Sequence, residues 1–235
     1  MPQSPFTPRD ATLIVTIDGP SGSGKGTISR AVAKHVGWHL LDSGALYRLV
    51  ALAGMRAGLA PDDEAGHARL AATMDAVFGV GPDSAEQVML DGLDVTGAIR
   101  SEEAGQGASR VAAWPAVRTA LMERQRAFAR PPGLVADGRD MGTVVFPHAD
   151  LKIFLTASPA ERALRRYKQL KDKGSDVSLA ALSREITERD LRDSTRTVAP
   201  LKPAPDAEVI DSTGLTVEQV VDRVMALGRV RAFWA

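Results

Sequence analysis

The sequence of 235 residues contains no cysteine and no asparagine, and each absence excludes a class of protein. Without cysteine the chain can form neither disulfide bonds nor metal sites built from thiolates, so we expect it to work in a reducing cytoplasm. Without asparagine it cannot supply the Asn-Lys-x-Asp element with which guanine-nucleotide switches recognise guanine. A regulatory GTPase is therefore strongly disfavoured.

A net charge and a long apolar run are missing as well. Lysine and arginine, 29 together, balance aspartate and glutamate, also 29, which argues against non-specific binding to nucleic acid or to a membrane surface. The longest apolar runs fall far below the about 20 residues of a membrane-spanning helix, so we expect no membrane association. The N-terminal segment MPQSPFTPRD is polar and proline-rich and lacks the apolar core of a signal peptide. We expect residues 1–11 to form a short disordered leader.

Short apolar segments alternate with helical segments along most of the chain, which predicts an α/β fold. We expect five buried strands, at residues 13–17, 38–41, 134–136, 151–155 and 207–210. We expect helices at residues 28–36, 45–58, 68–75, 101–113, 115–129, 159–171, 179–196 and 217–227, with acidic and loop-like residues at 61–67. This order predicts a parallel sheet covered by helices on both faces, with ligands at the carboxyl ends of the strands.

Residues 77–95 interrupt the alternation. They contain strand-like segments on either side of a turn at Asp91-Gly92, a dipeptide that favours a tight hairpin. We interpret this stretch as a small β-rich insertion.

Residues 13–27, LIVTIDGPSGSGKGT, carry the strongest functional signal. A β-branched apolar run leads into a glycine-rich turn, and Gly19, Gly24 and Lys25 match the phosphate-loop pattern of glycine, four residues, glycine and lysine. Small residues are needed because successive backbone N–H groups must approach phosphate oxygens, while the lysine supplies a mobile charge. The alternative is a glycine-rich turn that merely connects a strand to a helix, but strand, loop and helix all fall where the motif requires them.

The motif predicts that the chain binds a nucleoside triphosphate. The expected ATP-binding residues form one continuous stretch: Gly19, Pro20, Ser21, Gly22, Ser23, Gly24, Lys25, Gly26 and Thr27. One position departs from the common pattern, because Gly26 follows the lysine where serine or threonine is usual and Thr27 comes one place later. Direct ligation of magnesium by this hydroxyl is therefore left open.

Three polar residues, Asp18, Ser43 and Asp137, follow predicted strands at their carboxyl ends. A carboxylate at the position of Asp137 is where phosphate-loop proteins hold magnesium or its waters. The alternative is that Asp137 only caps the turn after its strand. Together with the phosphate loop, the position favours a magnesium site that Asp137 reaches through water.

Arginines gather in the second half of the chain. Arg189, Asp193 and Arg196 lie at i, i+4 and i+7, on one stripe of the predicted helix. Such a stripe can be a solvated, salt-bridged surface, but phosphoryl transfer also needs cations around three equatorial oxygens, and bidentate arginine suits them. The preceding helix adds arginines that could contact adenine or phosphate: Arg162, Arg165 and Arg166.

Two further arginines, Arg48 and Arg139, follow the strand ends at Ser43-Gly44 and Asp137-Gly138 by one helical turn or less. Both positions allow the guanidinium to reach the crevice at the carboxyl edge of the sheet. The alternative is that both are surface arginines.

With these residues in view, the chain resembles the bacterial cytidylate kinases, a family of nucleoside monophosphate kinases. The resemblance runs from about residue 12 to residue 224, and four motifs carry it: VTIDGPSGSGKGT at 15–27, LLDSGALYR at 40–48, ADGRDMGTVVFP at 136–147 and ERDLRDSTR at 188–196. The Gly-Lys-Gly-Thr ending of the phosphate loop is itself typical of these kinases. The resemblance implies an α/β phosphate-loop fold with a five-stranded parallel sheet, a monophosphate-binding insertion and a mobile, arginine-bearing lid.

The activity implied by the resemblance is transfer of the γ-phosphate of ATP, bound with Mg²⁺, to CMP or dCMP. In the family, residues matching Ser43, Ser109, Arg118 and Asp140 face cytosine, those matching Arg48, Arg139 and Arg196 hold the acceptor phosphate, and those matching Arg189 and Asp193 meet the sugar. The residues expected to act in the transfer are Lys25, Arg139, Arg189 and Arg196. No general base is required, because the acceptor phosphate is already an anionic nucleophile.

The expected organisation is a leader at 1–11, core with the phosphate loop at 12–59, monophosphate-binding insertion at 60–100, core and monophosphate-binding helices at 101–158, lid at 159–199 and core at 200–235. We expect a monomer whose partners are ATP and CMP or dCMP. The main alternative is another small-molecule kinase of the same fold, acting on UMP, AMP or shikimate. A phosphate-loop ATPase that works on DNA or RNA is disfavoured by the neutral charge.

Overall fold

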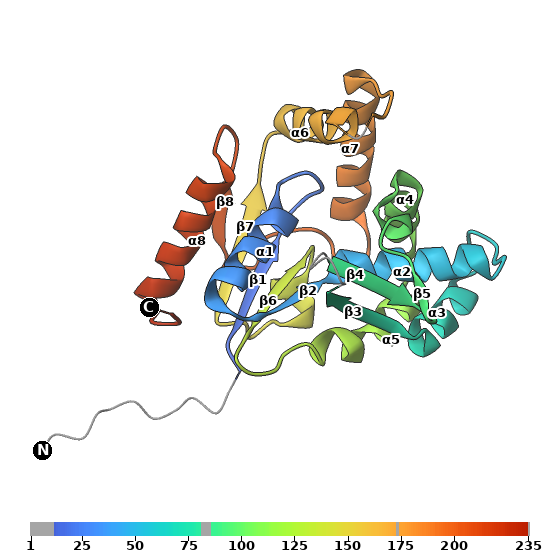
Figure 1. Ribbon diagram of the computed structural model, residues 1–235, viewed down its shortest axis with the longest axis horizontal. Coiled ribbons are helices and arrows are strands. Elements are labelled where there is room, and N and C mark those ends of the chain that lie inside the picture. Colours follow the sequence, from blue (N-terminus) through green and yellow to red (C-terminus); the bar gives the residue numbers. More distant parts are fainter. Residues whose placement is uncertain (1–11, 81–85, 173, 235) are drawn as a thin grey trace, which may run out of the picture.

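The computed structural model describes residues 12–80, 86–172 and 174–234, and the predicted leader lies outside them. Its centre is a five-stranded sheet in the order β2-β6-β1-β7-β8 (Figure 1). The strands are β1 (Ile14–Asp18), β2 (His39–Asp42), β6 (Leu134–Gly138), β7 (Leu151–Thr156) and β8 (Glu208–Asp211). Every neighbouring pair is parallel. The predicted five-stranded parallel sheet is confirmed.

Helices cover both faces of this sheet and form two separate cores. On one face, α1 (Lys25–Val36) and α8 (Val217–Val230) pack on Val15, Ile17 and Val135. On the other, α2 (Ser43–Arg56) and α5 (Pro115–Arg126) pack on Leu134 and Ala136. Successive residues of β6 therefore point to opposite cores, the alternation that a strand buried on both sides produces.

A smaller antiparallel sheet lies beside α2 and comprises β3 (Ala76–Val80), β4 (Glu86–Leu90) and β5 (Leu93–Asp94). It turns at Asp91 and Gly92, which have φ of 50° and 77°, as the predicted hairpin requires. Val88 and Leu90 anchor this sheet in the same core as α2. The strands predicted in this stretch are confirmed.

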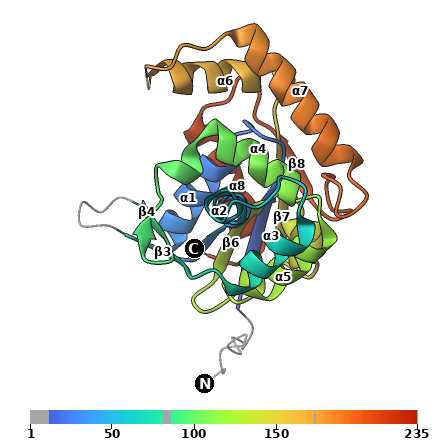
Figure 2. The same cartoon turned by 90° about the vertical axis from the view of Figure 1, so that its right-hand side faces the viewer.

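Two helices, α6 (Pro159–Asp172) and α7 (Leu179–Thr195), form an arch above the carboxyl edge of the large sheet (Figure 2). Few of their apolar side chains are buried: Ala163 on α6, and Leu182 and Ile186 on α7. The buried polar residues of the pair are Arg162 and Asp193. The arch is thus held to the rest of the protein largely by polar contacts.

One sequence prediction is wrong and others are incomplete. Residues 61–67 were expected to be loop-like, but α3 (Glu64–Thr73) begins within them. The helix starts there because the Asp63 side chain caps it, accepting a hydrogen bond of 2.8 Å from the N–H of Gly66. The remaining helix, α4 (Glu102–Val111), was expected. A 3-10 helix, η1 (Ala98–Arg100), and a π-helical turn, η2 (Met141–Val145), were not.

Within the described part of the chain, no helix has the length and apolar character needed to cross a membrane.

Candidate active site

The phosphate loop connects β1 to α1 through a very tight path. A Cβ atom on Gly19 would lie 2.0 Å from the carbonyl oxygen of Leu155, so only glycine fits at this position. Gly22 and Gly24 have φ of 78° and 92°, in the left-handed region that glycine adopts without strain. Lys25 is the first residue of α1, which places it where the N–H groups of the helix are unpaired. The strand, loop and helix order predicted from the sequence is confirmed.

Side chains of the arch hold the loop by its carbonyl oxygens. Arg162 donates to the Ser21 carbonyl at 3.0 Å, and Arg165 donates to the Ser23 carbonyl at 3.2 Å. Ser212, just after β8, also donates to the Ser23 carbonyl at 3.2 Å. The loop therefore depends on α6 for its shape.

A cavity of about 220 Å³ opens beside the loop at the carboxyl edge of the sheet. All nine predicted acceptor-binding residues line it: Ser43, Arg48, Ser109, Arg118, Arg139, Asp140, Arg189, Asp193 and Arg196. Lys25 and Asp137 line it as well. Residues that are distant in the sequence thus meet around one space.

The predicted ATP-binding stretch is divided. Ser21, Lys25 and Gly26 line the main cavity, while Ser21 and Gly22 line a neighbouring cavity of about 110 Å³ that also involves Arg166 and Arg189. The other predicted members, Gly19, Pro20, Ser23, Gly24 and Thr27, are not among the described residues that line the main cavity.

At one end of the main cavity, Arg118 from α5 and Asp140 from the segment after β6 form a buried ion pair. Arg118 also donates to the Tyr47 hydroxyl and to the Ala112 carbonyl, both at 3.3 Å. Arg196 lies 3.8 Å from Asp140 and donates to the Ala199 carbonyl at 2.5 Å. Two arginines therefore face the Asp140 carboxylate at this end of the cavity.

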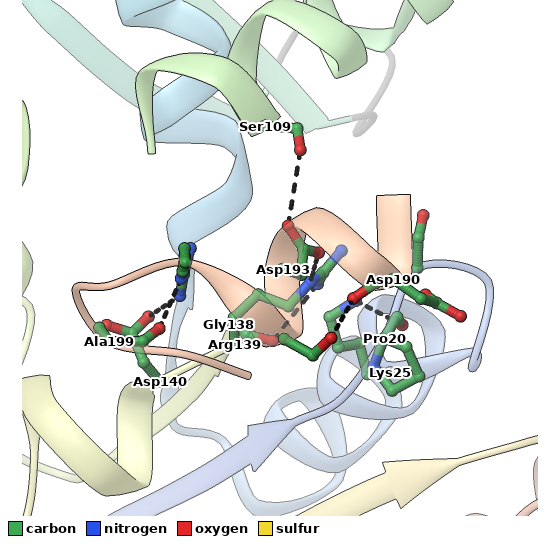
Figure 3. A network of polar contacts seen from close by, with 12 residues as sticks. Pro20, Lys25, Ser109, Gly138, Arg139, Asp140, Asp190, Asp193 and Ala199 are labelled. Carbon is green, nitrogen blue, oxygen red and sulfur yellow. Dashed lines mark hydrogen bonds and ion pairs between the residues drawn. The ribbon is translucent and has the colours of Figure 1, made fainter. Parts of the chain in front are cut away.

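The middle of the cavity is organised by Asp193 of α7 (Figure 3). Its carboxylate accepts a hydrogen bond of 2.9 Å from Arg139 Nε and lies 3.5 Å from the Ser109 hydroxyl. Burial alone would raise the pKa of Asp193, but Arg139, Arg189 and Arg196 outweigh it and hold that pKa below its usual value. Asp193 therefore joins the arch to β6 and α4 as a carboxylate.

Two cations at the phosphate-loop end have perturbed pKa values. Burial, with Arg139 as the next cause, lowers the pKa of Lys25 to about 7 and that of Arg189 to about 10. Lys25 Nζ donates to the Pro20 carbonyl at 3.2 Å, whereas Arg189 Nε is buried without a hydrogen-bond partner among the described residues. Cations held close together in this way favour an anionic ligand.

Several features of the site were not predicted from the sequence. Asp42 and Tyr47 line the cavity; Asp42 resembles Asp137 in ending a strand, a signal that could have identified it. Asp18 was expected near the ligand, but its carboxylate instead accepts the backbone N–H groups of Met141 and Gly142, both at 2.8 Å. Arg162 pairs with Asp190 on α7 and Arg166 with Glu102 on α4, contacts that the sequence could not specify.

Comparison with known proteins identifies the family. The model of the family "Cytidylate kinase" matches residues 15–229. The chain belongs to the cytidylate kinase family. It is 59% identical over 215 residues to a cytidylate kinase of Azotobacter vinelandii, covering 91% of this chain and 94% of that one. The cytidylate kinase of Methylococcus capsulatus is 57% identical over 213 residues, covering 91% and 95%.

The comparison with solved structures found distant similarities to other kinases. A shikimate kinase from Acinetobacter baumannii in complex with shikimate has 14% identity and a TM-score of 0.44, covering 94% of each chain. The assignment to the cytidylate kinase family rests on the sequence relatives, which cover nearly the whole chain.

Proposed function

We propose that the protein transfers the γ-phosphate of ATP, bound with Mg²⁺, to CMP or dCMP and so forms CDP or dCDP. One observation carries this proposal: the same cavity contains the phosphate-loop lysine, Lys25, and the buried Arg118–Asp140 pair. The first is suited to a triphosphate and the second to the polar edge of a base. The similarity to cytidylate kinases supports cytosine as that base.

The charges of the cavity suit two phosphorylated substrates. Among the residues that the structure describes, six cationic side chains and four carboxylates line it, a formal excess of two positive charges. We assign Arg48, Arg139 and Arg196 to the acceptor phosphate, and Arg189 and Asp193 to the sugar. Arg48 is held in place by the carbonyls of Ile99 and Ser101, at 2.7 and 3.1 Å. Such a prearranged set does not need to reorganise when charge shifts during the reaction.

Base recognition is assigned to Ser43, Ser109, Arg118 and Asp140. Cytosine carries an amino donor where uracil carries a carbonyl acceptor, and an ionised carboxylate can only accept. Asp140 therefore bonds the amino group of cytosine and repels the oxygen of uracil, while Arg118 donates to the acceptor edge of the ring. This assignment disfavours UMP as the acceptor.

Transfer requires no general base, because the acceptor phosphate is an anion at neutral pH. Lys25 and Arg189 neutralise the phosphoryl group in transit, and Arg139 and Arg196 keep the attacking phosphate in line with it. Both substrates carry several negative charges and repel one another in water. The main contribution of the protein is thus to hold two anions together.

The residues present fit a magnesium ion. Asp137 Oδ1 is buried without a hydrogen-bond partner among the described residues, and its carboxylate lies against the start of α1 beside Gly26. Burial raises the pKa of Asp137 to about 7, with Lys25 opposing the rise, so a nearby cation favours the ionised form. Carboxylates that contact Mg²⁺ through its water are common in kinases. When bound, the ion supplies charge neutralisation between the phosphates of ATP.

We also propose a separate role for each part of the chain. Residues 12–59, 101–158 and 200–235 provide the core with its monophosphate-binding helices, residues 60–100 the monophosphate-binding insertion, and residues 159–199 the lid. Acting on CMP would give the protein a place in pyrimidine nucleotide metabolism. We further propose that it is cytoplasmic and monomeric. Light scattering of the purified protein tests the oligomeric state, and a monomer would give a mass near 24.9 kDa.

The function is tested by an assay coupled to ADP release with a panel of acceptors: CMP, dCMP, UMP, AMP and shikimate. We expect kcat/KM to be highest with CMP or dCMP, and turnover to disappear when EDTA removes Mg²⁺. A higher kcat/KM with AMP, UMP or shikimate would contradict the proposal and identify another kinase of the same fold.

A further inference from the structure

Asp18 lies outside the cavity yet contacts the segment that carries Asp140. It ends β1, directly before the phosphate loop, and the register of the sheet places it beside Gly138 of β6. Its side chain is buried, 5% exposed, and each carboxylate oxygen accepts one backbone N–H, from Met141 and from Gly142, at 2.8 Å. Asp18 is not among the described residues that line the cavity, so it does not touch the substrate.

Met141 and Gly142 begin the π-helical turn η2, and Asp140 is the residue before it. The first N–H groups of any helix lack partners within the helix, and an aspartate directly before the helix usually satisfies them with its own side chain. Asp140 makes no such capping hydrogen bond. Its carboxylate instead pairs with Arg118 and lies near Arg196 at the cavity. The cap is supplied from another strand.

We propose that Asp18 is a positioning residue for base recognition: it caps η2 in place of Asp140 and thereby leaves the Asp140 carboxylate free to read cytosine. The inference rests on the proposed function, since it concerns the same site. Without Asp18, the N–H groups of Met141 and Gly142 would be buried without an acceptor. Asp140, directly before the turn, could replace it only by turning away from Arg118 and the cavity.

The phosphate loop should be much less affected, although Asp18 directly precedes it. Its shape is fixed by the contact of Gly19 with the Leu155 carbonyl and by the bonds from Arg162 and Arg165 to carbonyls of the loop. The proposal therefore predicts that loss of Asp18 impairs acceptor binding and acceptor choice more than ATP binding. A purely structural role would not produce this difference.

The capping contact is tested first in the wild-type protein by amide hydrogen exchange measured by NMR. Burial raises the pKa of Asp18 to about 7, so the measurement is made at pH 8, above that pKa, where the carboxylate is largely ionised. There the amides of Met141 and Gly142 should exchange slowly. Exchange as fast as that of exposed loop amides would overturn the proposal. This measurement requires no activity, so it judges the cap independently of the proposed function.

The consequence for recognition is tested with Asp18→Asn, whose amide can accept from only one of the two N–H groups. We expect KM for CMP to rise at least about tenfold and the CMP-to-UMP ratio of kcat/KM to fall at least about fivefold, with KM for ATP changed less than about twofold. If Asp18→Asn does not fold, Asp18→Ser, which keeps one acceptor oxygen, replaces it with the same expected difference. Equal effects on both substrates, or an unchanged ratio, would overturn the proposal.

A double-mutant cycle shows whether Asp18 acts through Asp140. In the Asp140→Asn background, adding Asp18→Asn should lower the CMP-to-UMP ratio by less than about twofold, because the carboxylate that it positions is already gone. Additive losses would show that the two residues act independently.

Asp150→Asn is the matched control. Asp150 accepts the N–H of Ile14 at 2.9 Å at the opposite edge of the sheet, so its substitution tests the general effect of losing such a carboxylate. It should leave the CMP-to-UMP ratio unchanged. If the wild type does not phosphorylate CMP, the proposed function fails; if it does and Asp18→Asn retains the full ratio, only this inference fails.

Discussion

Lys25 is the residue at which burial and neighbouring charge have the clearest chemical consequence. It faces the cavity and not the core, so replacing it creates no buried void. Lys25→Met should therefore keep the wild-type melting temperature. Its kcat should fall about 10²–10³-fold, the usual effect of removing one prearranged charge. Lys34→Met, the same substitution at the exposed end of α1, serves as the control and should retain full activity. More than a tenth of the wild-type rate in a folded Lys25→Met protein would contradict the assigned role.

The lowered pKa of Lys25 predicts a proton uptake. Burial is the main cause that lowers this pKa to about 7; Arg139 and Arg189 also lower it, while Asp137 and Asp42 oppose the shift. At pH 8 the free protein therefore carries a mostly neutral Lys25. A triphosphate favours the charged form, so ATP binding at pH 8 should take up about one proton. Calorimetric titrations in two buffers with different ionisation enthalpies measure this number; an uptake of zero would contradict the perturbed pKa.

At the scale of elements, the arch of α6 and α7 should respond to both substrates. Its contacts to the rest of the molecule are polar, among them Arg166 with Glu102 and Asp193 with Arg139. Arg189 of the arch lies near Arg139, whose charge adds to burial in lowering the pKa of Arg189. Phosphates of the two substrates would neutralise this repulsion, so closure should need both ligands. Amide exchange in residues 174–196 should slow most when CMP and a non-hydrolysable ATP analogue are present together. Unchanged exchange in these residues would contradict a mobile lid.

The elements that the sequence predicted best are those whose cause is local. The buried strands, the hairpin at Asp91-Gly92 and the phosphate loop follow from apolar runs and from glycine. The start of α3 was missed because the capping role of Asp63 was not considered among several acidic residues. The π-helical turn η2 was missed for another reason: its cap comes from Asp18, more than a hundred residues earlier in the chain. Contacts between distant segments leave no local pattern.

The candidate site shows the same limit. Its residues were predicted from the resemblance to the family, Ser109 and Arg118 from outside the four motifs, and the structure brings the nine acceptor-side residues together around one cavity. The sequence could not show that Arg118 pairs with Asp140 or that Asp193 links α7 to Arg139. Nor could it show that Arg162 is engaged with Asp190 and the phosphate loop. Which charges are paired within the protein depends on packing between elements.

For the molecule as a whole, Arg162 connects the arch, the phosphate loop and the sheet. Its buried guanidinium pairs with Asp190 at 2.5 Å and donates to the carbonyls of Ser21 and Ala157. Asp190→Ala would leave this buried cation without a carboxylate, at a cost of about 3 kcal/mol. For a protein of this size the melting temperature should then fall by about 6–12 °C.

The control for this prediction is Asp176→Ala, because Asp176 pairs with Lys171 in the same arch but is fully exposed. It should change the melting temperature by less than about 2 °C. Equal changes in melting temperature for the two variants would contradict the prediction and show that the Arg162–Asp190 pair contributes no more to stability than an exposed ion pair.

The central claim is that one cavity both transfers phosphate and reads cytosine, and it depends on Asp140. The most direct test is the CMP-to-UMP ratio of kcat/KM in the wild type and in Asp140→Asn, which keeps the shape but can donate as well as accept. A charge-assisted hydrogen bond contributes about 1.5–3 kcal/mol, so the ratio should fall at least about tenfold while part of the CMP activity remains. An unchanged ratio in a folded Asp140→Asn protein would contradict the account and show that another group reads the base.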